Sequence, residues 1–127
     1  MRVPLILKIS PDLTEDQIIS ISKFIKRYEI EGVIATNTTI NKSLLKNNKY
    51  HYFQGGLSGK PLNDKSNNII ELLNTNLDKD TTIIGVGGID SYQTAKMKID
   101  KGAKLLQIYT GLVYSGTNLI KEIVENL

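Results

Sequence analysis

The chain has 127 residues, 40% of them hydrophobic, and a formal net charge of +3 at pH 7. This length fits one small domain or part of a larger one, and the apolar fraction is sufficient to bury a core. The absence of cysteine excludes disulfides and thiolate chemistry. The only histidine, His51, lies in a polar stretch, which argues against a histidine-based metal site.

The distribution of charged and apolar residues limits the partners further. Lysines are scattered over the expected helices and loops, so we expect a solvated surface and no nucleic-acid partner. No apolar run approaches the roughly 20 residues that span a membrane. The N-terminus lacks the apolar segment of a signal peptide, which predicts an intracellular chain.

The first 39 residues predict two strands separated by a helix. The apolar run at residues 4–9 predicts a strand that contains one lysine, Lys8. Residues 14–17 form a capping box. The helix that follows has an apolar stripe at helical spacing, formed by Ile18, Ile21, Ile25 and Tyr28. A second strand is expected at residues 31–36, and it runs into the polar sequence Thr36-Asn37-Thr38-Thr39.

A long polar loop is expected between residues 40 and 60. Loops of that length inside a compact domain are usually functional or disordered. Its end, residues 55–61, is rich in glycine. A helix is then expected at about residues 62–77, with Ile69, Leu73 and Leu77 facing inward.

The last third of the sequence predicts two more strands, each followed by a helix. A β-branched strand is expected at residues 82–86 and a helix at residues 92–101, ending before Gly102. The fourth strand is expected at residues 104–109. The last helix is expected to bury Leu119 or Ile120, together with Ile123 and Leu127.

Strictly alternating strands and helices predict a parallel sheet with right-handed crossovers. Continuous apolar strands also predict burial on both faces of the sheet. Four βα units correspond to half of a (β/α)8 barrel, which needs about 250 residues when whole. We therefore assign the chain to the α/β class, as a half barrel with parallel strands.

The third strand ends in a glycine-rich turn. Gly85, Gly87 and Gly88 allow a sharp turn and a close backbone approach to a ligand, and Ser91 can cap the next helix. A strand, a glycine turn and a helix N-terminus together favour an anion site, although the same turn can form without a ligand. A dinucleotide fingerprint is excluded because Asp90 replaces its third glycine, and a P-loop is excluded by the spacing before Pro61.

Polar and glycine residues collect at the carboxyl ends of the expected strands, where parallel barrels place their active sites. They are Lys8, residues 36–39, Gly55, Gly56, Ser58, Gly59, Gly85, Gly87, Gly88, Tyr109, Thr110 and Gly111. The glycine loops after the last two strands favour a phosphate ligand. Lys8 is costly to bury unpaired, so it either faces outward or compensates a negative ligand. Asn37 can hydrogen-bond a planar polar ring; the alternative is that Asn37 or Thr38 caps a helix.

The sequence contains no Ser-His-Asp set, cysteine nucleophile or paired-carboxylate motif, and it shows no convincing general base. A cofactor that performs the difficult chemistry would account for this, as would a missing part of the protein. From the chain itself, we therefore assign no catalytic residue and no metal ligand.

Five motifs together resemble the C-terminal half of the class 2, quinone-dependent dihydroorotate dehydrogenases. They are Lys8-Ile-Ser-Pro-Asp-Leu13, Ala35-Thr-Asn-Thr-Thr39, Gly55-Gly-Leu-Ser-Gly-Lys-Pro-Leu62, Ile84-Gly-Val-Gly-Gly-Ile-Asp90 and Gln107-Ile-Tyr-Thr-Gly111. The resemblance identifies residues 1–127 as the C-terminal half of an FMN-binding TIM-barrel domain. It implies oxidation of dihydroorotate to orotate in pyrimidine (UMP) biosynthesis, with FMN as hydride acceptor and a quinone as final electron acceptor.

The resemblance also implies roles for individual residues. FMN would be bound by Lys8, Thr36, Gly59, Gly88, Tyr109 and Thr110, and the pyrimidine substrate by Asn37 and Thr38. Within the FMN set, Gly88, Tyr109 and Thr110 would hold the phosphate through main-chain N–H groups. The family often has serine at the position of Thr110, a change that a backbone contact tolerates.

The resemblance covers only part of the family's length. The catalytic serine base and the membrane-associating helices of the family belong to the N-terminal part, so the implied location is peripheral, on the cytoplasmic side of the inner membrane. We expect the chain alone to be soluble or aggregated, and inactive. Two alternatives stay open: a non-redox module that binds phosphate or flavin, and an inactive product of a truncated gene. A class 1 or pyrimidine-reducing relative fits residues 55–62 less well.

Overall fold

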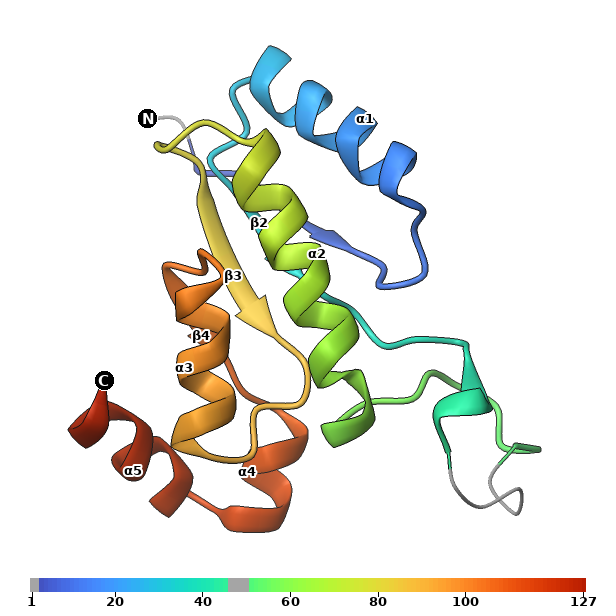
Figure 1. Cartoon of the computed structure of the whole chain (residues 1–127), viewed down its shortest axis with the longest axis vertical. Coiled ribbons are helices and arrows are strands. Elements are labelled where there is room, and N and C mark those ends of the chain that lie inside the picture. The colour runs from blue at the N-terminus through green and yellow to red at the C-terminus, as the bar shows by residue number, and fades with distance from the viewer. Residues whose placement is uncertain (1–2, 46–50) are drawn as a thin grey trace.

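The computed structural model describes residues 3–45 and 51–127, and within them four strands form one parallel sheet (Figure 1). The strands are β1 (Ile6–Ile9), β2 (Gly32–Ala35), β3 (Thr82–Val86) and β4 (Leu105–Gln107). They lie side by side in the order of the sequence, β1-β2-β3-β4. An order without reversal is that of a barrel wall rather than of a doubly wound sheet. The predicted half barrel is therefore confirmed.

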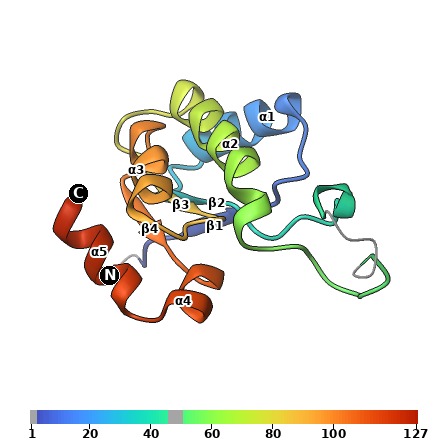
Figure 2. The same ribbon diagram turned by 60° about the horizontal axis from the view of Figure 1, so that its bottom comes forward.

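Helices α1 (Glu15–Arg27), α2 (Asn63–Asn76) and α3 (Tyr92–Asp100) cover one face of the sheet (Figure 2). The predicted capping box before α1 is confirmed, with Thr14 as the N-cap, and Ser91 caps α3 in the same way. Below the sheet in that view lie α4 (Thr110–Ser115) and α5 (Asn118–Asn126). Among the described residues, no helix is long and apolar enough to cross a membrane.

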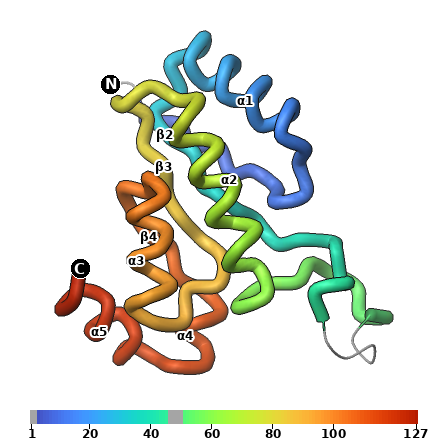
Figure 3. The backbone as a smooth tube through the Cα atoms, viewed as in Figure 1, coloured from blue at the N-terminus to red at the C-terminus, as the bar shows by residue number. Residues whose placement is uncertain are grey.

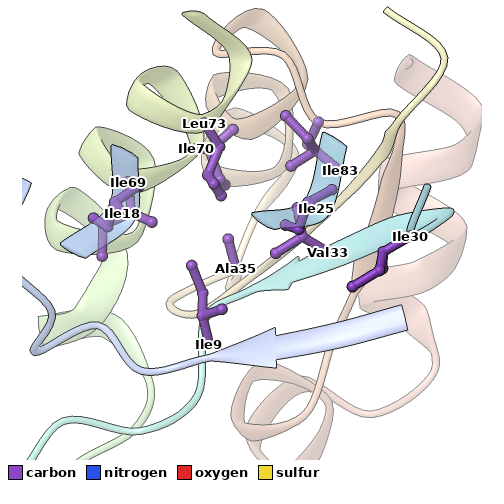
Figure 4. Close-up of a cluster of buried hydrophobic side chains, with 11 residues drawn as sticks. Ile9, Ile18, Ile25, Ile30, Val33, Ala35, Ile69, Ile70, Leu73 and Ile83 are labelled. Atoms are coloured by element: carbon purple, nitrogen blue, oxygen red, sulfur yellow. The ribbon is translucent and has the colours of Figure 1, made fainter. Parts of the chain in front are cut away.

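The core lies between the sheet and helices α1 and α2 (Figure 4). Each strand contributes alternate residues to it, since successive side chains point to opposite faces. Ile9, Val33, Ala35 and Ile83 meet Ile18 and Ile25 of α1 and Ile69, Ile70 and Leu73 of α2. Burial of an aliphatic side chain of this size contributes about 2 kcal/mol, so this layer holds the strand ends in place.

The expectation of strands buried on both faces is wrong for β1 and β4. The face away from α1–α3 leaves Ile6 of β1 43% exposed and Leu105 of β4 56% exposed. Each of these strands has one unpaired edge in the described chain. We call this side the open face of the sheet; on it, Lys8 lies opposite Ile34, and Ile84 lies opposite Leu105.

Two expectations about helix faces also need correction. Tyr28 is exposed, because α1 ends at Arg27, and its ring packs on Phe24 with 4.5 Å between the ring centroids. In α5, Leu119 and Ile123 are buried, whereas Leu127 lies after the last helical residue and is exposed.

The polar segment between β2 and α2 extends away from the body of the fold (Figure 3). It contains the short 3-10 helices η1 (Lys42–Leu44) and η3 (Lys60–Leu62). Its two ends are joined by a pair of backbone hydrogen bonds between Thr39 and Leu57, of 3.1 and 2.7 Å. Residues 46–50 of the expected loop lie outside the described residues. The bridge brings the glycine-rich end of the segment back beside the polar end of β2.

Candidate functional site

The carboxyl ends of the strands surround a pocket of about 260 Å³. Its lining includes seven of the eight residues that the sequence pointed to: Lys8, Asn37, Thr38, Gly59, Gly88, Tyr109 and Thr110. They come from all the strand ends and from the returning loop, and they are separated by up to 102 positions in the chain, from Lys8 to Thr110. The parallel order of the sheet brings them together, because it places every carboxyl end on the same rim.

Thr36, the eighth residue, does not line the pocket. Its side chain is buried, and its hydroxyl donates a hydrogen bond to the carbonyl of Asn37 at 3.0 Å. Its backbone N–H donates to the carbonyl of Val86 in β3, and the peptide bond that joins it to Ala35 is cis. Thr36 thus ties the end of β2 to β3, and the exposed Asn37 and Thr38 follow directly on the pocket side.

The polar run after β2 is held from outside the pocket by Asp12, in the turn that follows β1. One carboxylate oxygen of Asp12 accepts hydrogen bonds of 2.5 Å from the Thr39 hydroxyl and from the Lys65 ammonium. The other accepts the backbone N–H of Ile40 at 2.8 Å. Burial by itself would raise the pKa of Asp12, but these three hydrogen bonds outweigh it and hold the pKa below the ordinary 3.8.

The glycine turn after β3 forms the floor of the pocket beside α2. Gly88 has φ of +73°, and a Cβ at this position would lie 2.6 Å from Cβ and 2.8 Å from Cα of Asn63. Both the backbone conformation and the contact therefore require glycine. The Asn63 side-chain amide donates to the Gly88 carbonyl at 3.1 Å, which fixes the turn against the start of α2.

The opposite wall is formed where the returning loop meets the first residues of α4. Gly59 has φ of +78°, and a Cβ there would lie 2.9 Å from Cγ2 of Thr110. The Thr110 hydroxyl donates to the Ser58 hydroxyl at 3.0 Å. Close backbone approach at Gly59 thus lets the loop pack on Thr110 and close this side of the pocket.

Lys8 is the charged residue of the pocket lining within the described chain. Its side chain is exposed on the open face of the sheet. Lys8 therefore does not incur the cost of burying an unpaired lysine that was considered from the sequence. The other lining groups are uncharged: glycine turns, hydroxyls, amides and a few apolar side chains. One cation beside glycine turns suits a ligand that has a negative group and a planar polar part.

The described residues contain no group of three or more His, Cys, Asp and Glu side chains that could hold a metal ion. Among the lining residues that the sequence reasoning missed is Gln107 of β4, which pairs with Val86 in the sheet. The sequence signal that could have identified Gln107 is its polar side chain inside the otherwise apolar run at residues 105–108. Ile89 and Leu62 also line the pocket, and apolar residues at such places have no distinguishing pattern.

The sequence model of the family described as Dihydroorotate dehydrogenase matches residues 1–127. The chain is 50% identical to the dihydroorotate dehydrogenase (quinone) of Buchnera aphidicola subsp. Schizaphis graminum over 125 residues, which are 98% of this chain and 37% of that protein. It is also 50% identical to the enzyme of the same name from Legionella pneumophila (strain Corby), over 99% of this chain and 38% of that protein.

The structure agrees with the sequence comparison. It superposes on the crystal structure of DHODH from Eimeria tenella in complex with ferulenol with a TM-score of 0.90 and 30% identity, covering 98% of this chain and 33% of that one. The chain thus spans about a third of the length of these relatives. On the match over its whole length, the chain belongs to the dihydroorotate dehydrogenase family.

Proposed function

We propose that this chain forms the FMN- and substrate-binding wall of a quinone-dependent dihydroorotate dehydrogenase, which oxidises dihydroorotate to orotate in pyrimidine biosynthesis. The observation that carries the proposal is the pocket: seven of the eight residues expected from the family line it together. The relatives named dihydroorotate dehydrogenase (quinone) support the substrate and a quinone as electron acceptor. In the whole enzyme, we place this wall in a protein peripheral to the inner membrane.

The residues of the pocket fit FMN. Gly88 and Gly59 line the pocket and pack closely on Asn63 and Thr110, so they present main-chain atoms without a side chain, which a phosphate can approach closely. Main-chain N–H groups of Gly88, Tyr109 and Thr110 would hold that phosphate, and Lys8 would lie against the flavin. When bound, FMN supplies the acceptor for the hydride of the substrate.

Asn37 and Thr38 are the residues that we assign to the pyrimidine ring. Both are exposed, line the pocket and follow Thr36, whose hydrogen bonds fix the backbone before them. The amide of Asn37 offers two donors and one acceptor, which matches the alternating N–H and C=O groups of a pyrimidine. These side chains would orient the substrate against the cofactor, and a 1 Å misplacement costs about 100-fold in rate.

The test of the proposed cofactor is retention of FMN by the purified chain after gel filtration. We expect bound flavin, and we expect weaker binding in Lys8→Ala and in Gly88→Ala. Gly116→Ala is the matched control for glycine, because Gly116 also has positive φ, of +63°, but no atom lies within 4 Å of its missing Cβ. A chain that binds simple phosphate esters but no flavin would instead support the non-redox module.

The pocket lining has no carboxylate, histidine or cysteine that could act as a general base in the described chain. We therefore expect the 127-residue polypeptide, with FMN and a quinone added, to oxidise dihydroorotate at no measurable rate. The assay follows orotate formation by absorbance. Turnover at the rate of a full-length relative under the same conditions would contradict this proposal.

A further inference from the structure

Lys98, on α3, is fully buried and does not line the pocket. Its ammonium donates hydrogen bonds to two α2 side chains, the Ser66 hydroxyl at 3.1 Å and the Asn67 side-chain carbonyl at 2.9 Å. Both partners are themselves buried. Lysine is rarely fully buried, and a lysine placed so has to be held by specific partners.

Two short paths connect these partners to the glycine turn of the pocket. On the first path, the Ser66 hydroxyl donates to the carbonyl of Val86 at 2.6 Å. On the second path, Asn67 donates to the side-chain carbonyl of Asn63 at 3.0 Å, and Asn63 donates to the carbonyl of Gly88 at 3.1 Å. The Lys98 ammonium can only donate, so the Ser66 hydroxyl oxygen and the Asn67 side-chain carbonyl accept from it. The Ser66 hydroxyl hydrogen and the Asn67 NH₂ group are then free to donate toward the glycine turn.

The carbonyls at the ends of these paths fix the orientation of two peptide planes. Both peptide bonds, Val86–Gly87 and Gly88–Ile89, are trans. In a trans peptide unit, the N–H points away from the C=O. Holding the Val86 and Gly88 carbonyls against α2 therefore directs the N–H groups of Gly87 and Ile89 away from α2. Gly87 and Ile89 both line the pocket.

We propose that Lys98 is a positioning residue, which acts through Ser66, Asn67 and Asn63 to orient the N–H groups of the glycine turn toward an anionic group in the pocket. The proposal rests on the proposed function for the identity of that group, the phosphate of FMN. A glycine turn has unusual backbone freedom, so its N–H groups bind an anion well only if neighbouring residues fix their orientation. The carbonyls of Val86 and Gly88 are the points at which α2 and α3 do so.

Lys98 also packs against the sheet, with its Cβ 3.2 Å from the position of a Cβ on Gly85, so its loss will also affect stability. The decisive measurement therefore compares two ligands that differ only in the phosphate. We would titrate the wild-type chain, Lys98→Met and Lys96→Met with FMN and with riboflavin. Lys96 is the matched control: it lies on the same helix, is exposed, and forms an ion pair with Asp100 at 2.7 Å.

In Lys98→Met, we expect the affinity for FMN to fall about tenfold and the affinity for riboflavin to change less than about threefold. Lys96→Met should leave both affinities unchanged. A loss that is equal for the two ligands, or no loss for FMN, would overturn the proposal, because a purely packing role does not distinguish the phosphate.

A second measurement needs no ligand and separates this inference from the proposed function. The amplitude of backbone motion at Gly87, Gly88 and Ile89, measured by ¹⁵N relaxation, should be larger in Lys98→Met than in Lys96→Met, relative to the amides of α1. Ser66→Ala removes the bond to Val86 and a longer one, of 3.4 Å, to the carbonyl of Ala35, and it should increase motion at Gly87 and spare Ile89. If the wild-type chain binds no FMN, the proposed function fails and the relaxation measurement alone decides. Unchanged motion in the turn would overturn the role of Lys98.

Discussion

Asp12 and Lys98 lie outside the pocket, yet each contacts the segments that form it. Asp12 joins the turn after β1 to the polar run after β2 and to Lys65 of α2. Lys98 joins α3 to α2 and, through it, to the turn after β3. These two side chains support different segments around the pocket, so substitutions at each position should affect different parts of the site.

We expect Asp12→Ala to lower the free energy of unfolding by about 1 to 3 kcal/mol at pH 7, because it leaves Thr39, Ile40 and Lys65 without their acceptor. The folded-state pKa of Asp12 lies below 3.8, so its stabilising contribution is present above pH 3.8 and is lost as the pH falls through the folded-state value. Urea unfolding at several pH values measures both effects.

The control for this experiment is Asp80→Ala, since Asp80 is exposed. It should change the free energy of unfolding by less than about 0.5 kcal/mol. A stability difference between wild type and Asp12→Ala that stays constant from pH 7 to pH 2 would show that the carboxylate charge contributes nothing.

Lys98 gives the opposite dependence on pH. Burial lowers the pKa of Lys98 from 10.5 to about 8, with a smaller opposing effect from the carboxylate of Asp64. Between pH 8 and 10.5, the unfolded chain therefore binds more protons at this lysine than the folded chain does. Stability that depends on Lys98 rises with pH over that range, by an amount on the order of 3 kcal/mol at most.

This dependence is measured as the difference in free energy of unfolding between wild type and Lys98→Met, at pH 8 and at pH 10.5. The difference should move in favour of wild type at the higher pH. Because other titrating lysines are common to both proteins, they cancel in the comparison. A difference that is the same at both pH values would mean that Lys98 keeps its ordinary pKa in the folded chain.

Neither residue could be assigned its structural role from the sequence. The partners of Asp12 lie 27 to 53 positions away, so no local pattern connects them. Lys98 lies three residues after the buried Ala95, which places it on the inner face of α3, but lysine in a helix is usually solvated. The pocket residues were easier to predict because the motifs that contain them directly follow recognisable strands.

At the scale of elements, the sequence predicted helices and strands most accurately where residue composition and capping residues indicated the same boundaries. The β-branched run of β3 was predicted at residues 82–86, as observed, and the capping box at Thr14 and the N-cap Ser91 marked the starts of α1 and α3. Helix α4 was missed: its six residues, Thr110–Ser115, include Gly111, Val113 and Tyr114, which have poor helix propensity. Tertiary contacts hold α4, since a Cβ on Gly111 would lie 2.0 Å from the Ile89 carbonyl oxygen.

The capping box before α1 gives a prediction at this scale. Thr14→Ala removes the hydroxyl that accepts the N–H of Gln17 at 3.3 Å, and it should lower the free energy of unfolding by about 1 kcal/mol. Thr75→Ala is the control, because Thr75 is exposed inside α2 and its hydroxyl donates to the carbonyl of Glu71, within the same helix. Alanine should be neutral or stabilising there. Equal losses in the two variants, measured by urea unfolding, would argue against a specific capping effect.

At the scale of the whole molecule, alternating elements were enough to predict a parallel sheet but not which of its faces is covered. An apolar run such as Leu105-Leu106 of β4 has the same sequence pattern whether one face of the sheet or both are buried. The relatives are about 2.7 times as long as the segment that matches this chain, since it covers 37% of them. A barrel wall has an inner face by construction, and in this chain that face is open.

Exposed apolar side chains on a sheet with two unpaired edges favour self-association. Ile6 and Leu105 are 43% and 56% exposed, on opposite edge strands. We therefore expect the double variant Ile6→Thr, Leu105→Thr to reduce concentration-dependent association in sedimentation velocity while it leaves the free energy of unfolding within about 1 kcal/mol of wild type. Threonine is β-branched, a shape that strands favour, so the sheet itself should be preserved.

The control is a second pair of residues on the same two strands whose side chains point to the covered face of the sheet. Leu7 and Leu106 are the next residues along these two strands, and both pack against the buried core on the helix side. Leu7→Thr, Leu106→Thr should cost several kcal/mol, because it places hydroxyls in the apolar layer, and it should increase association through the unfolded chain. If the open-face pair destabilises as much as the covered-face pair, then Ile6 and Leu105 are buried in solution, and a second copy of the chain covers the open face.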